Sequence, residues 1–190
     1  GVTGKGGLSD SELTLAEALK GAGYRTAMLG KWHLGYAEEK FLPVNQGFDS
    51  WFGLPYSNDM MPPWVKTEVP LWLYEGTKRV EHPVNQDTLT TRYTERAVKF
   101  LERDHDKPFF LACGIFRPHL RWYAPRKYFD MHPLEKIKLP ATLENDLDDV
   151  PPRGRRQNSG GSQAFGVIKE HGEWKKAVQG YLASCSFADA

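Results

Sequence analysis

Apolar residues recur at helical and then at extended spacing in the first part of the chain. From 9 to 22 they recur at intervals of three and four, which predicts a helix with its N-cap at 9–11 and its end at two glycines. Its apolar stripe is expected at Leu15, Ala18, Leu19 and Ala22. The short run 24–29 between glycines predicts a strand.

The same order, a helix followed by a strand, is repeated further along the chain. A second amphipathic pattern predicts a helix over 88–103, with its stripe at Tyr93, Ala97, Phe100 and Leu101. The continuous apolar run 108–115 follows, and such a run is typical of a strand buried on both faces of a parallel sheet. Helix-strand units in this order favour an α/β domain with a largely parallel sheet.

The remaining segments have weaker patterns. Residues 35–78 are rich in Pro, Gly and Asn and are expected to be irregular, with short strands at best. A long irregular surface excursion is expected at about 139–162. A short helix is expected over 125–132, and a last helix is expected to start near His171. The last helix has one apolar face, made of Trp174, Val178, Tyr181 and Cys185.

Composition narrows the class of protein. With 190 residues the chain can form one domain, and its formal net charge of +1 argues against nucleic acid or a membrane surface as a partner. No run of about twenty apolar residues is present, so no membrane span is predicted. Cys113 and Cys185 are expected to be buried free thiols. The pattern does not predict an oligomeric state.

Basic side chains follow both predicted core strands. Lys31 and His33 follow the first strand, and Arg117 and His119 follow the second. Parallel strands end at one edge of a sheet, where ligands of open α/β sheets bind. In an extended segment Lys31 and His33 would point to the same side, the lysine suited to an anionic oxygen and the histidine to proton exchange. This pattern predicts an oxyanion site and does not distinguish sulfate from phosphate. Taken singly, each of these basic residues is more typical of an exposed surface group or a structural residue.

Several segments resemble the sulfatase family. Residues 30–35, Gly-Lys-Trp-His-Leu-Gly, match its second signature, and residues 14–29 resemble the segment that leads into it. Residues 43–49 and 53–59 resemble arylsulfatases. Residues 107–111 and 117–119 resemble the strand and loop that contain a further active-site histidine in the family. Residues 133–135 and the helix ending near Ser186 resemble the iduronate-2-sulfatase branch.

The resemblance implies an alkaline-phosphatase-like α/β sandwich and the hydrolysis of sulfate esters, of sulfated sugars or aryl sulfates. Residues 1–190 would be a partial catalytic domain, incomplete at both ends. Lys31 would bridge the nucleophile and the sulfate, and His33 would hydrogen-bond the nucleophile. His119 would contact the sulfate and protonate the leaving alcohol. The resemblance assigns no definite role to Arg117, which is expected only as a possible substrate contact. A periplasmic, secreted or lysosomal-type compartment is implied.

The resemblance also implies groups that these residues do not supply. The family nucleophile is a formylglycine made from cysteine in a C-x-P-x-R motif, which this sequence lacks, so it is expected upstream of residue 1. The calcium ligands are likewise expected outside this chain, and Asp148 and Asp149 are not expected to replace them. Asn58 and Asp59 are expected in a turn or cap. The isolated chain is therefore expected to be inactive.

Two other functions remain open at this point. One is a phosphate or phosphonate hydrolase of the same superfamily, because a lysine and a histidine suit either anion. The other is a non-catalytic module that binds sulfated glycans through the same basic residues.

Overall fold

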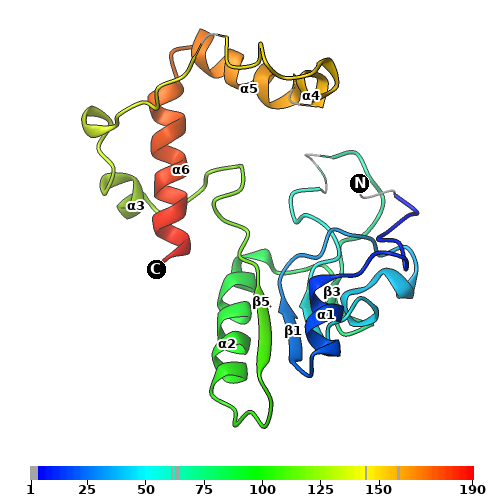
Figure 1. Ribbon diagram of the computed structural model, residues 1–190. Coiled ribbons are helices and arrows are strands. Elements are labelled where there is room, and N and C mark those ends of the chain that lie inside the picture. Colours follow the sequence, from blue (N-terminus) through cyan, green and yellow to red (C-terminus); the bar gives the residue numbers. More distant parts are fainter. Residues whose placement is uncertain (1–3, 61, 63–64, 144, 158) are drawn as a thin grey trace. The chain divides into compact units, whose positions relative to one another are not determined.

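The computed structural model describes residues 4–60, 62, 65–143, 145–157 and 159–190, with backbone alone for 156, 157 and 159–164. The chain forms two compact units, and the boundary between them in the sequence lies between Phe116 and Arg117 (Figure 1). The first unit contains the sheet, and the second contains only helices and loops within the described residues.

The first unit is built on one five-stranded sheet. Its order is β4-β3-β2-β1-β5, with β2, β1 and β5 parallel and β3 and β4 added as an antiparallel hairpin. The strands are β1 (Arg25–Leu29), β2 (Ser50–Gly53), β3 (Leu73–Glu75), β4 (Lys78–Glu81) and β5 (Phe109–Cys113). The predicted α/β class with a largely parallel sheet is confirmed, and the short strands fall where the sequence is rich in turn residues.

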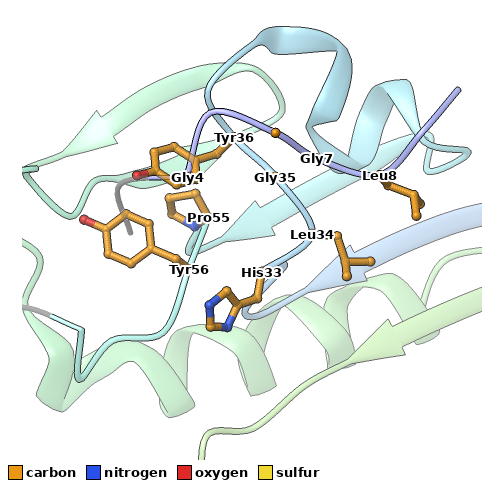
Figure 2. A pocket seen from close by; sticks show the side chains of 10 residues that line it. Gly4, Gly7, Leu8, His33, Leu34, Gly35, Tyr36, Pro55 and Tyr56 are labelled. Carbon is orange, nitrogen blue, oxygen red and sulfur yellow. The ribbon is translucent and has the colours of Figure 1, made fainter. Parts of the chain in front are cut away.

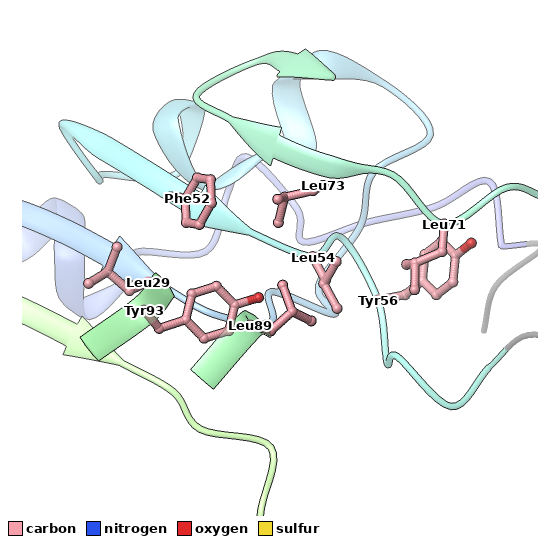
Figure 3. Close-up of a cluster of buried hydrophobic side chains, with 8 residues drawn as sticks. All are labelled: Leu29, Phe52, Leu54, Tyr56, Leu71, Leu73, Leu89 and Tyr93. Atoms are coloured by element: carbon pink, nitrogen blue, oxygen red, sulfur yellow. The ribbon is translucent and has the colours of Figure 1, made fainter. Parts of the chain in front are cut away.

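Buried side chains cover both faces of this sheet. Phe52 belongs to a cluster with Leu89 and Tyr93 of helix α2 (Leu89–Leu101), which Figure 3 shows beside the strands. Trp51 belongs to a second cluster, with Tyr74 of β3 and Leu42 of the loop before β2. Since neighbouring strand residues point to opposite faces, the helix covers one face and the loop covers the other.

Helix α1 spans Leu15–Gly21, so its predicted start was too early. Thr14 caps it: the Thr14 hydroxyl accepts from the Glu17 amide, and the Glu17 carboxylate accepts from the Thr14 amide. The predicted apolar stripe was also wrong, because Ala16 is buried while Leu15 is 64% exposed. The reason is a tertiary contact, since Gly47 packs tightly against the backbone of Ala16 and Glu17.

Strand β5 lies at the edge of the sheet, so the prediction that both its faces are buried was wrong. Phe109 is 37% exposed and no residue of β5 is fully buried. It pairs with β1 alone among the described strands. The helix before it was predicted correctly as α2, although Leu101 is 53% exposed. Cys113 is exposed and Cys185 is partly buried, so both are free thiols as predicted but neither is buried.

The second unit has more helix than the sequence predicted. Its helices are α3 (Arg126–Asp130), α4 (Pro152–Gln157), α5 (Ser159–Glu170) and α6 (Trp174–Ala188). Residues 145–149 form turns, but the expected excursion is wrong from Pro152, which is the first residue of α4, where proline is favoured. Residues 144 and 158 of that stretch lie outside the described residues.

The buried face of α6 also differs from the predicted one. It consists of the small residues Gly180, Ala183 and Ser184, while Tyr181 of the predicted face is 47% exposed. The indole of Trp122 packs against Gly180, which explains why a small residue stands there. No helix among the described residues is both long and apolar enough to cross a membrane.

Asp49, at the end of segment 43–49, ties the loop before β2 to strand β1. Its carboxylate accepts a hydrogen bond from the Thr26 amide at 2.9 Å and pairs with Lys20 Nζ at 2.8 Å. Partial burial would raise the pKa of Asp49, but the hydrogen bonds from Lys20 and Thr26 and the charge of Lys20 outweigh it. The pKa therefore lies below the ordinary value of 3.8.

We expect Asp49→Asn to lower the stability of the full-length protein at neutral pH. The pKa of Asp49 is lower in the folded than in the unfolded state, so its contribution is complete above the unfolded pKa. It is lost as the pH falls through the folded pKa, so the gap between wild type and variant should close below pH 3.8. Urea unfolding at several pH values measures this, with exposed Asp104→Asn as the control. A gap independent of pH would contradict the assignment.

Glycines lie where the three parallel strands end. Gly53 closes β2, Gly30 follows β1 and Gly114 follows β5. The Gly30 amide donates to Phe52 O at 3.0 Å, and the Gly114 amide donates to Leu29 O at 2.9 Å. A methyl group added at Gly53 would overlap the carbonyl oxygen of Gly30, and one at Gly30 would overlap that of Gly114. The three backbones therefore approach one another more closely than any side chain permits.

We expect Gly53→Ala to lower the free energy of unfolding by about 2–4 kcal/mol, because backbone and not a flexible side chain must move. Gly21→Ala at the end of α1 is the matched control, since a methyl group there meets no atom within 4 Å. It should raise stability by about 0.5 kcal/mol. Denaturant unfolding of both variants measures the difference. Equal effects would show that the strand ends are loosely packed.

Candidate active site

The segment 30–36 leaves β1 and runs along the segment that follows β2. The Trp32 amide donates to Leu54 O at 2.9 Å, and the His33 amide donates to Pro55 O at 3.0 Å. The Trp32 indole packs on the second cluster and donates to Phe41 O at 2.7 Å. The indole is therefore structural, as the sequence indicated, and the loop has a fixed path.

His33 has a backbone conformation that is rare for its residue type. Its φ is +64°, and no other described residue except glycine has a positive φ. The extended geometry assumed for residues 31–33 is therefore wrong at His33, and alternation along a strand does not place Lys31 and His33 on one side. Such a conformation costs about 1–3 kcal/mol and clusters at functional sites, so it supports a role for His33.

His33 lines a hollow of about 420 Å³, which Figure 2 shows from close by. Three segments surround it: Gly4 and 6–8, residues 33–36, and residues 55–56. The first segment is held by a hydrogen bond of 2.8 Å from the Leu8 amide to Leu34 O. Lys31 is partly buried and is not among the residues that line this hollow. The convergence of Lys31 and His33 on one anion therefore stays a prediction.

Two tyrosines that the sequence analysis did not select, Tyr36 and Tyr56, line the hollow. The rings of Tyr36 and Tyr56 lie 5.0 Å apart, and Tyr56 Oη donates to Val69 O at 3.2 Å. Burial, with the neighbouring tyrosines, raises the pKa of Tyr56 to about 12. Burial also raises the pKa of Tyr36. Both phenols are therefore neutral at physiological pH. Tyr56 belongs to the buried core, and the partly buried Tyr36 brings an aromatic ring to the hollow, which no sequence spacing signalled.

Asn58 and Asp59 lie in a turn, as expected. The Ser57 hydroxyl donates to the Asp59 carboxylate, and the Asn58 amide donates to the side-chain oxygen of Gln86 at 3.1 Å. The Gln86 amide donates in return to Asn58 O at 3.0 Å. These bonds join the turn to the segment before α2.

His119 lies in a loop of the second unit. Its side chain is exposed, and its Nδ1 lies 2.7 Å from Leu120 O. Nη1 of Arg117 donates to Arg121 O at 2.7 Å and to His119 O at 3.4 Å. Partial burial lowers the pKa of Arg117. The proximity of His119 to Lys31 and His33, and the expected contact of Arg117 with substrate, stay predictions.

Calcium has no ligand set among the residues that the structure describes. No three side chains of His, Cys, Asp or Glu gather there in a way that could hold a metal ion. Asp148 and Asp149 lie in turns. The expectation that calcium and formylglycine come from outside this chain stays a prediction.

Curated relatives at the level of sequence are sulfatases. The chain is similar to arylsulfatase G of Rattus norvegicus, 42% identical over 146 residues, covering 63% of this chain and 28% of that protein. It is 35% identical to arylsulfatase G of Homo sapiens, covering 81% and 30%. It is 38% identical to N-acetylgalactosamine-6-sulfatase of Mus musculus, covering 65% and 25%. The chain thus spans less than a third of these relatives.

Solved structures show the same fold. One is described as a complex with its substrate D-glucosamine-2-N,6-O-disulfate; it has a TM-score of 0.53 and 22% identity, and the match covers 97% of this chain and 45% of that one. A sulfatase from Pseudoalteromonas sp. has a TM-score of 0.50 and 24% identity, covering 90% and 38%. These likenesses confirm the alkaline-phosphatase-like α/β fold.

The family itself follows from the sequence match. The model of the sulfatase family matches residues 1–189, nearly the whole chain. That match includes the loop 30–35 and the loop of His119. The chain belongs to the sulfatase family.

Proposed function

We propose that the protein to which this chain belongs hydrolyses sulfate esters. The observation that supports this most directly is the conformation of loop 30–35, the segment that resembles the family signature. It follows a parallel strand at its carboxyl end, and it holds His33 with a φ of +64° at the rim of a hollow. Membership of the sulfatase family agrees with this reading.

Three side chains are proposed to act on the sulfate. Lys31 offers a point positive charge to the nucleophile and a sulfate oxygen. His33 hydrogen-bonds the nucleophile and exchanges a proton with it. His119 donates a proton to the oxygen of the leaving alcohol. The first two belong to the first unit and the third to the second, so the proposal requires the two loops to meet in the full-length enzyme.

The substrate is proposed to be a sulfated sugar or an aryl sulfate. Relatives named for aryl sulfates and for N-acetylgalactosamine 6-sulfate are both similar to this chain, as is a structure with a disulfated glucosamine. The partly buried ring of Tyr36, which lines the hollow beside His33, fits either choice, since sugar rings and aryl rings both pack on aromatic surface. We also propose a periplasmic, secreted or lysosomal-type compartment, by the family resemblance.

Calcium and formylglycine are proposed to come from residues outside 1–190. When bound, calcium would polarise the sulfate, and formylglycine would supply the attacking oxygen. The described residues do not form a site for the metal. The part of this chain in the reaction is therefore to bind the anion and to move protons.

Lys31→Ala and His33→Ala should each lower kcat for an aryl sulfate by at least about a hundredfold in the full-length enzyme. This is the scale of losing one electrostatic or proton-transfer group. Lys99→Ala is the control, because Lys99 is exposed on α2. Rates near wild type in both variants would remove the site assignment.

The full-length enzyme should hydrolyse an aryl sulfate faster than the matching aryl phosphate, and the isolated chain 1–190 should hydrolyse neither. Steady-state rates with both esters test this. Faster phosphate hydrolysis would favour a phosphate or phosphonate hydrolase. Tight binding of a sulfated glycan without turnover by the full-length protein would favour a binding module. Turnover by residues 1–190 that depends on Lys31 would show that the nucleophile lies within this chain.

A further inference from the structure

The loop around His119 satisfies its own backbone carbonyls. The Trp122 indole donates to Pro118 O at 3.0 Å. Nη1 of Arg117 donates to Arg121 O at 2.7 Å and, at the longer distance of 3.4 Å, to His119 O. The carbonyl between these two, Leu120 O, lies 2.7 Å from His119 Nδ1. Four successive carbonyls therefore have partners within the loop, which fixes its backbone.

The contact at Leu120 O determines which ring nitrogen of His119 carries a proton. A carbonyl oxygen can only accept, so Nδ1 must be the donor. The neutral ring then has its lone pair on Nε2, and the charged ring has a second proton there. Nε2 is therefore the atom of His119 that gains and loses a proton.

Arg117 acts on the carbonyls on both sides of that contact. One nitrogen of its guanidinium, Nη1, donates both to His119 O, the carbonyl before Leu120 O, and to Arg121 O, the carbonyl after it. A guanidinium is planar and always charged near neutral pH, so it orients such acceptors more firmly than a flexible ammonium does. The carbonyls on either side of Leu120 O are therefore bound by one guanidinium.

Trp122 fixes the same loop to a helix of the same unit. Its indole packs against Gly180 of α6 and meets the ring of Tyr181 edge to face, with centroids 6.3 Å apart. The bond from this indole to Pro118 O connects the helix to the loop. Arg117 therefore binds the carbonyls of residues 119 and 121 in a loop that Trp122 attaches to α6.

We propose that Arg117 is a positioning residue: it holds the Leu120 carbonyl, which fixes the His119 ring with Nε2 as the proton donor to the leaving oxygen. This inference rests on the proposed function, in which His119 is the general acid. It is an alternative to the expected substrate contact of Arg117, which stays a prediction, and it is supported by the two bonds from Nη1 to loop carbonyls.

The proton transfer has a consequence that depends on the substrate. As the S–O bond breaks, its electron pair goes to the leaving oxygen, which takes the proton from Nε2, and the sulfuryl group passes to the attacking nucleophile. His119 is left neutral with its proton on Nδ1. An acidic phenol leaves well without this proton, whereas an aliphatic alcohol does not. Loss of positioning should therefore slow only esters of weakly acidic alcohols.

The experiment measures kcat and KM of the full-length enzyme over a series of sulfate esters with leaving groups of increasing pKa. Arg117→Ala should lower kcat about 10–100-fold for alkyl or sugar esters and about twofold or less for an acidic phenol, with KM nearly unchanged. His119→Ala should show the same trend with a larger loss. The double variant should match His119→Ala within about twofold, because both changes remove one function.

Two further variants guard against a folding defect. Arg117→Gln retains an amide donor for one carbonyl, so it should fold and show the same trend with a smaller loss. Arg126→Ala removes the same charge from α3, where the side chain is 91% exposed, and should behave as wild type.

The outcomes separate the two proposals. A raised KM for all esters, with losses that multiply in the double variant, would show a direct substrate contact and overturn the positioning role. Wild-type kinetics in both Arg117 variants would also overturn it. If His119→Ala itself has no dependence on the leaving group, the acid role fails and the inference fails with it, whereas the first two outcomes leave His119 as the acid.

Discussion

The close approach of three backbones at the ends of the parallel strands is the constraint on which the first unit depends. A side chain at Gly53 would overlap the carbonyl of Gly30, and a side chain at Gly30 would overlap the carbonyl of Gly114. Because the strands lie so close there, the Gly30 carbonyl can accept from the buried Trp51 indole at 3.1 Å. Any wider spacing would leave that indole without a partner in the core, a cost of about 1–3 kcal/mol.

This spacing also explains the path of loop 30–35, which contains the proposed catalytic residues Lys31 and His33. The chain leaves β1 at Gly30 and meets the segment after β2 at once, where Leu54 and Pro55 accept its amides. Those bonds and the packing of Trp32 hold the backbone up to His33, and the bond from the Leu8 amide to Leu34 O holds it after His33. The cost of the rare conformation of His33 is therefore met by the fold, as is typical where geometry serves function.

The sequence predicted elements that depend on local pattern and missed those that depend on tertiary contact. Strand β1 and helix α2 have strong periodicity, and loop 30–35 has a specific signature, so each was located correctly. The burial of Ala16 depends on Gly47, which is 31 residues away in the sequence, and the edge position of β5 depends on sheet order. The hollow beside His33 is formed by three separate segments, so no single stretch of sequence predicts it.

The signature 30–35 combines two kinds of residue with different reasons to be present. Gly30 and Trp32 have partners in the core and would be needed in any protein with these strand ends. Lys31 and His33 differ in burial from the core residues: Lys31 is partly buried and His33 is exposed. Fold alone does not require a cation and an imidazole there. The proposed hydrolysis of a sulfate ester would give both a reason to be there, since a lysine suits an anionic oxygen and a histidine suits proton transfer.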